Sequence, residues 1–259
     1  MNGSELRTAL HAGTRVYGTG IVSTSPAWPP MIARLGFDLV FLDLEHIPIP
    51  RDTLSWMCRT YAALGLAPIV RIPAPDPYTA CTVLDAGAAG IIAPYLETVD
   101  QIRALRGALR LRPLKGERLQ GLLDGTTPVE PELKQWLEAR NDHSVMIVNI
   151  ESKPALDHLD ELLDVPGIDA VLVGPFDLSV NLGLPEQYQH PTFLAAIKTI
   201  IDKSRARNIG VGIHYSGGTD FEILWAKQGA NLIMHSSDIS TAEQGYKRNL
   251  EALKGSLKD

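Results

Sequence analysis

Two carboxylates follow two successive predicted strands in the middle of the chain. Glu151 ends the run Val148-Asn-Ile-Glu, and Asp177 lies in the run Val173-Gly-Pro-Phe-Asp. Their spacing is close to one strand–helix repeat, so neighbouring strands would bring both to the same edge. Like charges that close need a proton or a cation, and Mg²⁺ or Mn²⁺ prefers carboxylate oxygen. The pair therefore predicts a divalent-metal site, unless each carboxylate only caps the helix that follows it.

A histidine and an arginine follow two earlier predicted strands. His46 lies in the run Asp43-Leu-Glu-His, and Arg71 ends the run Ala67-Pro-Ile-Val-Arg. Asp43 can orient the His46 imidazole and raise its basicity, which suits a general base. The guanidinium of Arg71 suits a substrate carboxylate or a developing oxyanion. The alternatives are an ordinary loop histidine, and a structural ion pair from Arg71 to Asp43 or Glu45.

A cation, a base and an arginine together suit enolate chemistry on a 2-oxo acid. A Schiff-base aldolase would instead need a lysine at a strand end. Lys153 comes closest, but it begins a predicted helix. We therefore expect a divalent metal (Mg²⁺, Mn²⁺ or Co²⁺) and no Schiff-base lysine. We expect no nucleotide cofactor, because Gly18-Thr-Gly20 is only a fragment of the dinucleotide-binding GxGxxG pattern.

The elements that position these residues follow one rhythm, in which short apolar runs alternate with longer amphipathic ones. The predicted strands are Val16–Val22, Leu39–Leu42, Pro68–Arg71, Ile91–Ala93, Val145–Ile150, Ala170–Val173, Val211–Ile213 and Leu232–Met234. Strands that alternate with helices favour a parallel sheet with right-handed crossovers. Eight such units in this length predict a TIM (β/α)8 barrel, whose sites lie at the C-terminal ends of the strands.

One segment interrupts this rhythm. Residues 112–143 are polar and contain several glycines and prolines. Loops of this length are uncommon and often serve as lids or binding loops. No linker separates two domains, so we expect a single domain over residues 1–259 with an irregular loop region at 112–143.

Composition narrows the class of protein. The chain has 259 residues, of which 45% are hydrophobic, and its net charge is −6, which argues against nucleic-acid and anionic-membrane partners. The two cysteines, Cys58 and Cys81, form no CxxC pair, so a zinc site is not expected. No apolar run is long enough for a signal peptide or a membrane span, and we expect a cytoplasmic protein.

In combination, these motifs resemble the HpcH/HpaI-type metal-dependent 2-oxo acid aldolases. The resemblance spans nearly the whole chain. It rests on the runs Gly36-Phe-Asp-Leu-Val-Phe-Leu-Asp-Leu-Glu-His46, Pro68-Ile-Val-Arg71, Leu84-Asp-Ala-Gly-Ala88, Asn149-Ile-Glu151 and Val173-Gly-Pro-Phe-Asp-Leu-Ser179. It implies a TIM barrel whose last helix is swapped between partners. It also implies a homo-oligomer, either a trimer or a hexamer built as a dimer of trimers.

The resemblance also implies roles for individual residues. Glu151 and Asp177 would be the metal ligands, and His46 would be the base, supported by Asp43. Arg71 would bind the substrate and stabilise the oxyanion. The implied reaction is the reversible aldol cleavage of a 2-oxo-4-hydroxy acid to pyruvate and an aldehyde, through a metal-stabilised enolate.

Two further contributions follow from the resemblance. Asp85 would come from a neighbouring subunit to complete the acid–base network. The backbone around Gly174, Pro175 and Phe176 would help to hold the pyruvate carboxylate.

Several positions depart from the family pattern, and we expect them to shape the substrate pocket. Gly20 stands where a tryptophan is common, and would widen the pocket. Asn149 replaces a glutamine, Phe176 replaces a small residue, and His214 and His235 stand where apolar residues are common. The usual Pro-Pro-x-Gly-x-Arg-Gly loop is replaced by Arg112-Pro-Leu-Lys-Gly-Glu-Arg-Leu-Gln-Gly121, in which Arg118 is the counterpart of the arginine.

Other functions fit part of the same pattern. An oxaloacetate decarboxylase would use the same enolate, whereas a lyase acting on a CoA thioester would need a basic groove. A phosphorylated substrate is also open, because the turn Ser216–Thr219 lies where barrels often bind phosphate. A catalytically silent metal-binding homologue is a further alternative, but it would have no chemical reason to keep His46, Arg71, Glu151 and Asp177 together.

Overall fold

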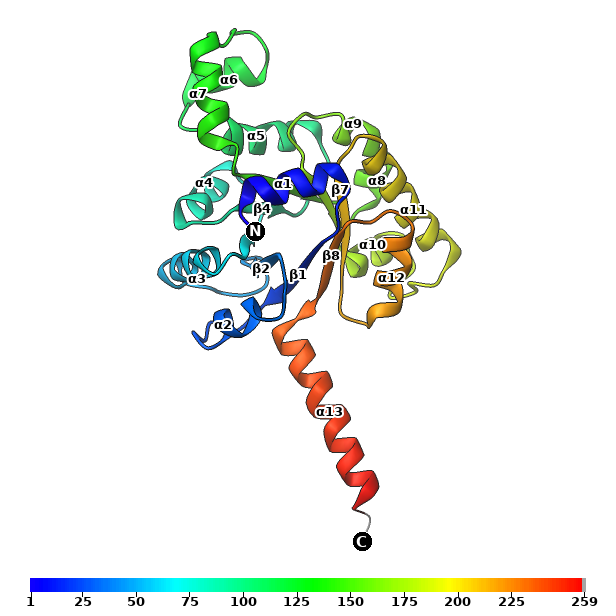
Figure 1. Cartoon of the computed structure of the whole chain (residues 1–259). Helices are drawn as coiled ribbons and strands as arrows, with labels where there is room; N and C mark the ends of the chain where they lie inside the picture. Colours follow the sequence, from blue (N-terminus) through cyan, green and yellow to red (C-terminus); the bar gives the residue numbers. More distant parts are fainter. Residues whose placement is uncertain (258–259) are drawn as a thin grey trace.

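The computed structural model describes residues 1–257, and its eight strands form one closed parallel barrel (Figure 1). Each strand pairs with the next, and β8 pairs with β1, so the sheet has no free edge. The strands are β1 (Val16–Ile21), β2 (Leu39–Asp43), β3 (Ala67–Arg71), β4 (Gly90–Ala93), β5 (Val145–Asn149), β6 (Ala170–Val173), β7 (Gly210–Tyr215) and β8 (Leu232–Ser237). The predicted TIM barrel is confirmed.

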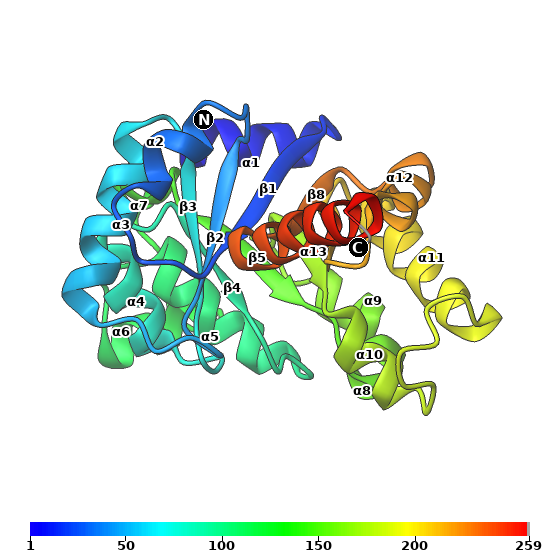
Figure 2. The ribbon, with the colours of Figure 1, turned by 90° about the horizontal axis from the view of Figure 1, so that it is seen from below.

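The helices surround this barrel. They are α1 (Gly3–Ala12), α2 (Trp28–Ala33), α3 (Arg51–Ala63), α4 (Pro77–Ala86), α5 (Val99–Arg110), α6 (Gly116–Leu123), α7 (Pro131–Asn141), α8 (Lys153–Asp157), α9 (Leu159–Leu163), α10 (Pro175–Asn181), α11 (Pro191–Ala206), α12 (Thr219–Lys227) and α13 (Asp238–Ser256). Seen from below, α3, α4 and α5 lie along one side, and α11 and α12 lie along the other (Figure 2). The ring of helices leaves the two ends of the barrel as the places where a ligand could enter.

The barrel interior is packed rather than hollow. Inward-pointing apolar side chains such as Leu39, Ile69 and Ile147 form one cluster, which also includes Leu6 and Leu10 of α1. Helix α1 therefore closes the N-terminal end of the barrel. The outward-pointing side chains belong to a second, larger cluster with the surrounding helices. The packed interior and α1 thus leave the C-terminal ends of the strands as the open end of the barrel, where sites of this fold usually lie.

Residues 112–143 are not the irregular loop that we expected, because they contain helices α6 and α7. Pro131 begins α7, where a proline fits the first helical turn, and Leu119 and Leu123 of α6 pack against Gly107 of α5. This segment connects α5 to β5, so it lies at the N-terminal end of the barrel. Figure 1 shows both helices projecting on the side away from α13. The segment therefore cannot close as a lid over the strand ends of its own barrel.

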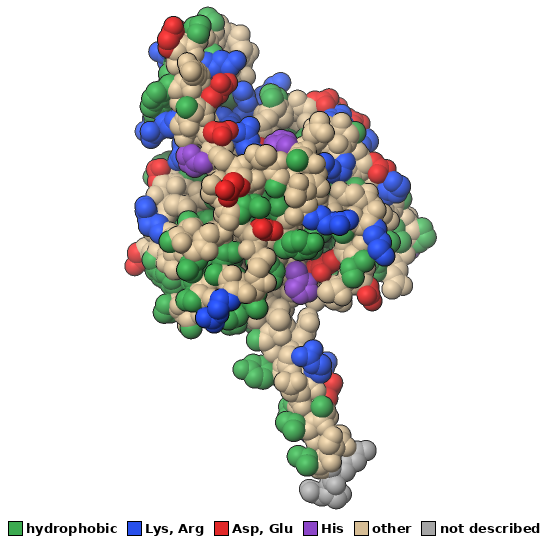
Figure 3. Space-filling view, viewed as in Figure 1, with side chains coloured by type: hydrophobic (Ala, Val, Ile, Leu, Met, Phe, Trp, Pro, Cys, Tyr) green, Lys and Arg blue, Asp and Glu red, His purple; other side chains and the backbone are tan. Residues whose placement is uncertain are grey.

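Helix α13 leaves the barrel instead of packing across β8 and β1 (Figures 1 and 2). Its apolar side chains recur at intervals of three, four or seven residues, which is the pattern of an amphipathic helix, yet they are exposed (Figure 3). They are Ile239, Tyr246, Leu250 and Leu253, and the exposed Leu257 directly follows the helix. On the barrel, Tyr17 of β1 is 47% exposed. An apolar helix face and an apolar barrel face are thus both uncovered in the single chain.

No helix within residues 1–257 is both long enough and apolar enough to cross a membrane.

A buried carboxylate, Asp169, ties together the N-terminal end of the barrel. It is fully buried, and its oxygens lie 2.9 Å from Nε of Arg7, 2.9 Å from Nε2 of His11 and 2.5 Å from Nη2 of Arg110. It also accepts a hydrogen bond from the backbone N–H of Met146. Burial alone would raise the pKa of Asp169, but the hydrogen bond from His11 and the charge of Arg110 hold it below the ordinary value of 3.8.

We expect Asp169→Asn to lower the free energy of unfolding by about 3 kcal/mol, because it leaves two guanidinium groups without their shared anion. The lowered pKa means that the stabilisation is present above pH 4 and is lost as the pH falls through the folded-state pKa. Urea unfolding at several pH values measures this difference. Asp157→Asn is the control, because Asp157 pairs with Lys153 on the surface. Equal effects of the two substitutions at pH 7 would contradict this account.

Candidate active site

The C-terminal ends of the strands surround two adjoining cavities. The larger is about 460 Å³, and its lining includes Arg71, Asn149 and His214. The smaller is about 280 Å³, and its lining includes Glu151. His46 and Asp177 line both cavities and so mark their common border. The barrel thus brings most of the predicted site residues to one mouth.

The carboxylate of Glu151 is held from both sides directly after β5. Its Oε1 accepts a hydrogen bond from the backbone N–H of Tyr95 at 3.1 Å, and its Oε2 accepts one from Nδ2 of Asn149 at 2.9 Å. Glu151 is only 7% exposed. Burial raises the pKa of Glu151 above its ordinary value, and the charge of Asp177 adds to this, against the two hydrogen bonds. An added cation would relieve both effects.

Gly174 marks the place where the two carboxylates converge. A Cβ atom at this position would lie 2.7 Å from Oε2 of Glu151 and 3.5 Å from Oδ2 of Asp177. Any larger residue would therefore fill the space that both carboxylates face. Glycine keeps that space open, and the carboxylate oxygens that border it are the donors that a hard divalent cation prefers.

Neither carboxylate serves as a helix cap. Ser152 caps α8, and no side chain caps α10, which contains Asp177. Within residues 1–257 no group of three or more His, Cys, Asp and Glu residues could enclose a metal. Two carboxylates suit an ion that keeps several positions for water and substrate, as Mg²⁺ usually does.

Arg71 forms a bidentate ion pair at the end of β3. Its Nε and Nη2 atoms lie 2.9 Å and 2.6 Å from the two oxygens of Asp43, and Nε lies 3.0 Å from Oε2 of Glu45. Burial alone would raise the pKa of Asp43, but the hydrogen bond and charge of Arg71 lower it below its usual range. The structural ion pair that we weighed as an alternative is therefore present. Arg71 nevertheless also lines the larger cavity.

His46 does not pair with Asp43 as predicted. Its side chain is 62% exposed, and its Nε2 lies 3.8 Å from Oε2 of Glu45, which is its partner among the described residues. Asp43 is instead occupied by Arg71 and by the backbone N–H of Glu45. The prediction that Asp43 is the partner of His46 is therefore not met in this structure, where Glu45 is the nearer carboxylate. The Asp-Leu-Glu-His run alone does not indicate which of its two carboxylates will bind Arg71.

Tyr95 is a site residue that the sequence did not indicate. It follows β4 and adopts a left-handed backbone with φ of 55°, which is uncommon for a residue other than glycine. This conformation lets its N–H reach Glu151. Its side chain lines the smaller cavity, where a hydrogen bond with Glu45 raises the pKa of Tyr95 to about 12.

Gly20 does not widen the pocket as we expected. A Cβ at Gly20 would lie 3.2 Å from the carbonyl oxygen of Ser236 and 3.7 Å from Nε2 of His214. The His214 ring also stands edge-on to Phe41, with 5.2 Å between ring centres. His214 occupies the space beside Gly20, so it forms the wall of the larger cavity there.

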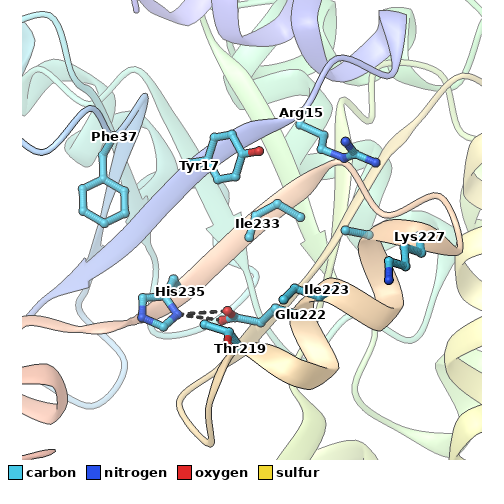
Figure 4. Close-up of a pocket in the computed structure, with 10 residues that line it drawn as sticks. Arg15, Tyr17, Phe37, Thr219, Glu222, Ile223, Lys227, Ile233 and His235 are labelled. Carbon is cyan, nitrogen blue, oxygen red and sulfur yellow. Dashed lines mark hydrogen bonds and ion pairs between the residues drawn. The ribbon is translucent and has the colours of Figure 1, made fainter.

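His235 and Asp85 lie away from both cavities. His235 belongs to β8 rather than following it, and it points outward into a separate groove of about 580 Å³ (Figure 4). There its Nδ1 lies 3.0 Å from the carboxylate of Glu222. Asp85 is exposed on α4 and pairs with Arg112 at 3.2 Å. Arg118, the predicted counterpart of the arginine in the family loop, pairs with Glu130 and lines neither cavity.

Two further predictions concern the lining of the larger cavity and the position of the lysines. Gly174, Pro175 and Phe176 line the larger cavity. No lysine within residues 1–257 lines either cavity, and Lys153 is bound to Asp157 on the surface. The site therefore contains no Schiff-base candidate within the described chain.

Comparisons with known proteins identify the family of this chain. The model of the HpcH/HpaI aldolase/citrate lyase family matches residues 21–242. The 2-keto-3-deoxy-L-rhamnonate aldolase of Shigella boydii serotype 4 is 34% identical over 203 residues, which are 78% of this chain and 76% of that protein.

Solved structures of the same kind superpose closely. An HpcH/HpaI aldolase from Desulfitobacterium hafniense DCB-2 has a TM-score of 0.82 at 26% identity over 96% of both chains. Citrate synthase SbnG has a TM-score of 0.81 at 26% identity, over 97% of this chain and 98% of that one. This chain belongs to the HpcH/HpaI aldolase/citrate lyase family, as a carbon–carbon lyase of the aldolase type.

Proposed function

We propose that this protein catalyses the reversible aldol cleavage of a 2-oxo-4-hydroxy acid to pyruvate and an aldehyde, with a divalent metal held by Glu151 and Asp177. The observation that carries the proposal is the convergence of these carboxylates on the space beside Gly174. The similar protein from Shigella boydii is named for a 2-keto acid, which supports this substrate class. Mg²⁺, Mn²⁺ and Co²⁺ are the candidate ions.

The metal supplies positive charge that binds a 2-oxo acid and stabilises the enolate formed from it. The residues of the chain orient the substrate and stabilise the charge that develops on it. Arg71 lies on the wall of the larger cavity, where its charge stabilises the developing oxyanion. The ion pairs with Asp43 and Glu45 fix the direction of its guanidinium group. The backbone of Gly174, Pro175 and Phe176 lines the same cavity and holds the pyruvate carboxylate.

His46 is the general base that removes the proton of the 4-hydroxyl group during cleavage. Its imidazole is exposed at the border of the two cavities, so it can reach a substrate bound beside Asp177. Glu45 takes the role that we first gave to Asp43, because its carboxylate is the one near the ring. The exposed Asp85 would contribute from a neighbouring copy.

The oligomer is part of this proposal. The exposed apolar stripe of α13 and the groove lined by Tyr17, Ile223 and Ile233 are two apolar surfaces that the single chain leaves uncovered. We infer that α13 of one copy covers this groove of another, and that the protein is a trimer or a hexamer built as a dimer of trimers. Exchange of a terminal helix is a common route to symmetric assemblies.

The CoA-thioester alternative finds no support in the site. Arg71 is the single lysine or arginine that lines either cavity within residues 1–257, and it is already paired. CoA phosphates would therefore meet no basic groove. A silent homologue is disfavoured because the carboxylates, Arg71 and His46 surround one mouth. Oxaloacetate decarboxylation would use the same enolate, and no separate observation favours it.

Chelation with EDTA should abolish pyruvate release from 2-oxo-4-hydroxy acids, and added Mn²⁺ should restore it. Glu151→Gln should weaken Mn²⁺ binding, measured by calorimetry without substrate, by about 100-fold or more. Glu97→Gln is the matched control, because Glu97 lines the same cavity but is exposed. Full activity in EDTA, or equal Mn²⁺ affinity for both variants, would contradict the metal assignment.

His46→Ala should lower the rate of cleavage by about 10²- to 10⁴-fold, the usual contribution of a positioned acid–base group. The exposed ring makes little packing contact, so the melting temperature should stay unchanged. His158→Ala, which removes another exposed histidine, is the control. Pyruvate release coupled to lactate dehydrogenase measures the rate, and an unchanged rate for His46→Ala would exclude it as the base.

Leu250→Asp should dissociate the oligomer into smaller species, because it places a charge in the apolar stripe of α13. Glu251→Lys alters the neighbouring position outside this stripe and should leave the assembly intact. Light scattering after size-exclusion chromatography gives the mass. A monomeric wild-type protein, or an unchanged mass for Leu250→Asp, would show that α13 does not hold the assembly together.

A further inference from the structure

The larger cavity has a wall that the proposed chemistry leaves unassigned. This wall, here called the acceptor wall, consists of Glu186, Tyr188, His214, Tyr215 and Ser216. We propose that the acceptor wall binds the aldehyde half of the substrate and selects an uncharged aldehyde that carries a hydroxyl group, with Glu186 as the specificity-determining residue. The inference rests on the proposed function and names the substrate class of that site.

The acceptor wall carries one negative charge. Glu186 lines the cavity, and it forms no ion pair with any residue in the described part of the chain. Arg71 is engaged with Asp43 and Glu45. A carboxylate or phosphate on the aldehyde would therefore lie beside an unneutralised Glu186 and, within residues 1–257, meet no unpaired lysine or arginine in the cavity lining. Because Glu186 is exposed to solvent, the repulsion is partly screened, and we expect it to disfavour such an aldehyde about tenfold.

The backbone of Glu186 is held in place by a hydrogen bond to α10. Its backbone has φ of 58°, an uncommon conformation for glutamate, and its N–H donates to Oγ of Ser179 at 3.0 Å. The Ser179 hydroxyl in turn donates to the carbonyl oxygen of Phe176 at 2.8 Å. This chain of hydrogen bonds ties Glu186 to α10, the helix that carries Asp177. The carboxylate is therefore carried by a segment fixed to the proposed metal site.

The acceptor wall also offers hydrogen-bonding groups to a ligand. Nε2 of His214 lies 3.0 Å from the carbonyl oxygen of Ser236, so this nitrogen carries the proton and donates. Burial lowers the pKa of His214, which keeps its ring neutral and leaves Nδ1 as an acceptor. Glu186 and His214 offer acceptors, whereas Tyr188, Tyr215 and Ser216 carry hydroxyl groups that can donate or accept. A hydroxyl group on the ligand also does both, so it matches this wall without adding charge.

The turn after β7 does not favour phosphate. Helix α12 begins there with Asp220 in its first turn, and Asp220 lines the same surface as Gly217 and Gly218. Its carboxylate opposes a second anion at the helix start. The phosphorylated substrate that the Ser216–Thr219 turn left open is therefore the less favoured choice. An aldehyde of the glycolaldehyde or glyceraldehyde type fits the same surface.

Glycolaldehyde and glyoxylate form a matched pair for the test, because they are of similar size and differ in replacing a hydroxymethyl group by a carboxylate. The value of kcat/KM is measured for the condensation of each with pyruvate in the presence of Mn²⁺. We expect the wild-type protein to prefer glycolaldehyde. The preference should decrease as salt rises, because the repulsion is screened. A wild-type preference for glyoxylate would overturn the proposal.

Glu186→Gln removes the charge and keeps the shape. It should raise kcat/KM for glyoxylate about tenfold and lower the value for glycolaldehyde, because an amide oxygen accepts a hydroxyl hydrogen bond more weakly than a carboxylate does. Glu186→Asn serves as a second variant, because asparagine tolerates the left-handed backbone. Glu132→Gln, which changes the net charge equally on an exposed part of α7, should leave the ratio unchanged. An unchanged ratio for both Glu186 variants would overturn the assignment.

Exchange of the pyruvate methyl protons in deuterated water separates this inference from the proposed function, because it reports enolate formation without any aldehyde. Exchange without a selectivity change at Glu186 would reject the acceptor wall and leave the aldolase proposal standing. Absence of metal-dependent exchange would reject the aldolase proposal, and the acceptor wall with it.

Discussion

Glu151 and Asp177 bring two carboxylates to one partly buried space beside Gly174, and like charges in such a place need a partner. The surrounding structure is arranged so that the pair persists. Tyr95 adopts a left-handed backbone to donate to Glu151, Asn149 donates from the other side, and Gly174 keeps the intervening space free. Local backbone strain of this kind is typical of functional sites. The barrel supplies the rigid frame in which this arrangement can be held.

The charge of Arg71 is neutralised within the protein, whereas within residues 1–257 the charges of Glu151 and Asp177 are not. Arg71 is held by Asp43 and Glu45, so its charge is directed rather than free. The remaining wall contains Glu186 without a cation and a neutral His214. The two halves of the cavity thus differ in their electrostatics. One half suits an anionic 2-oxo acid with its metal, and the other suits an uncharged aldehyde.

Much of this could be predicted from the sequence, and the failures have physical causes. The β-strand rhythm and the residues at strand ends could be predicted because most strands, such as β2, β5 and β6, are short runs buried on both faces. The boundaries of β7 and β8 were set too short, and His235 was therefore assigned to the mouth although it points outward from β8. Residues 112–143 contain glycine and proline at helix ends, which resemble loop signals unless the packing of Leu119 and Leu123 is known. Gly20, Tyr95 and Glu186 depend on contacts between segments far apart in the chain, and no local pattern reveals them.

The central claim is that Glu151 and Asp177 share one divalent ion with a 2-oxo acid. A crystal structure of the protein with Mn²⁺ and pyruvate tests it most directly, through the anomalous signal of manganese. We predict a single anomalous peak beside Gly174, from one Mn²⁺ ion bound by both carboxylates, with pyruvate next to Arg71. A peak elsewhere, or a direct hydrogen bond between Glu151 and Asp177 with no ion between them, would contradict the account.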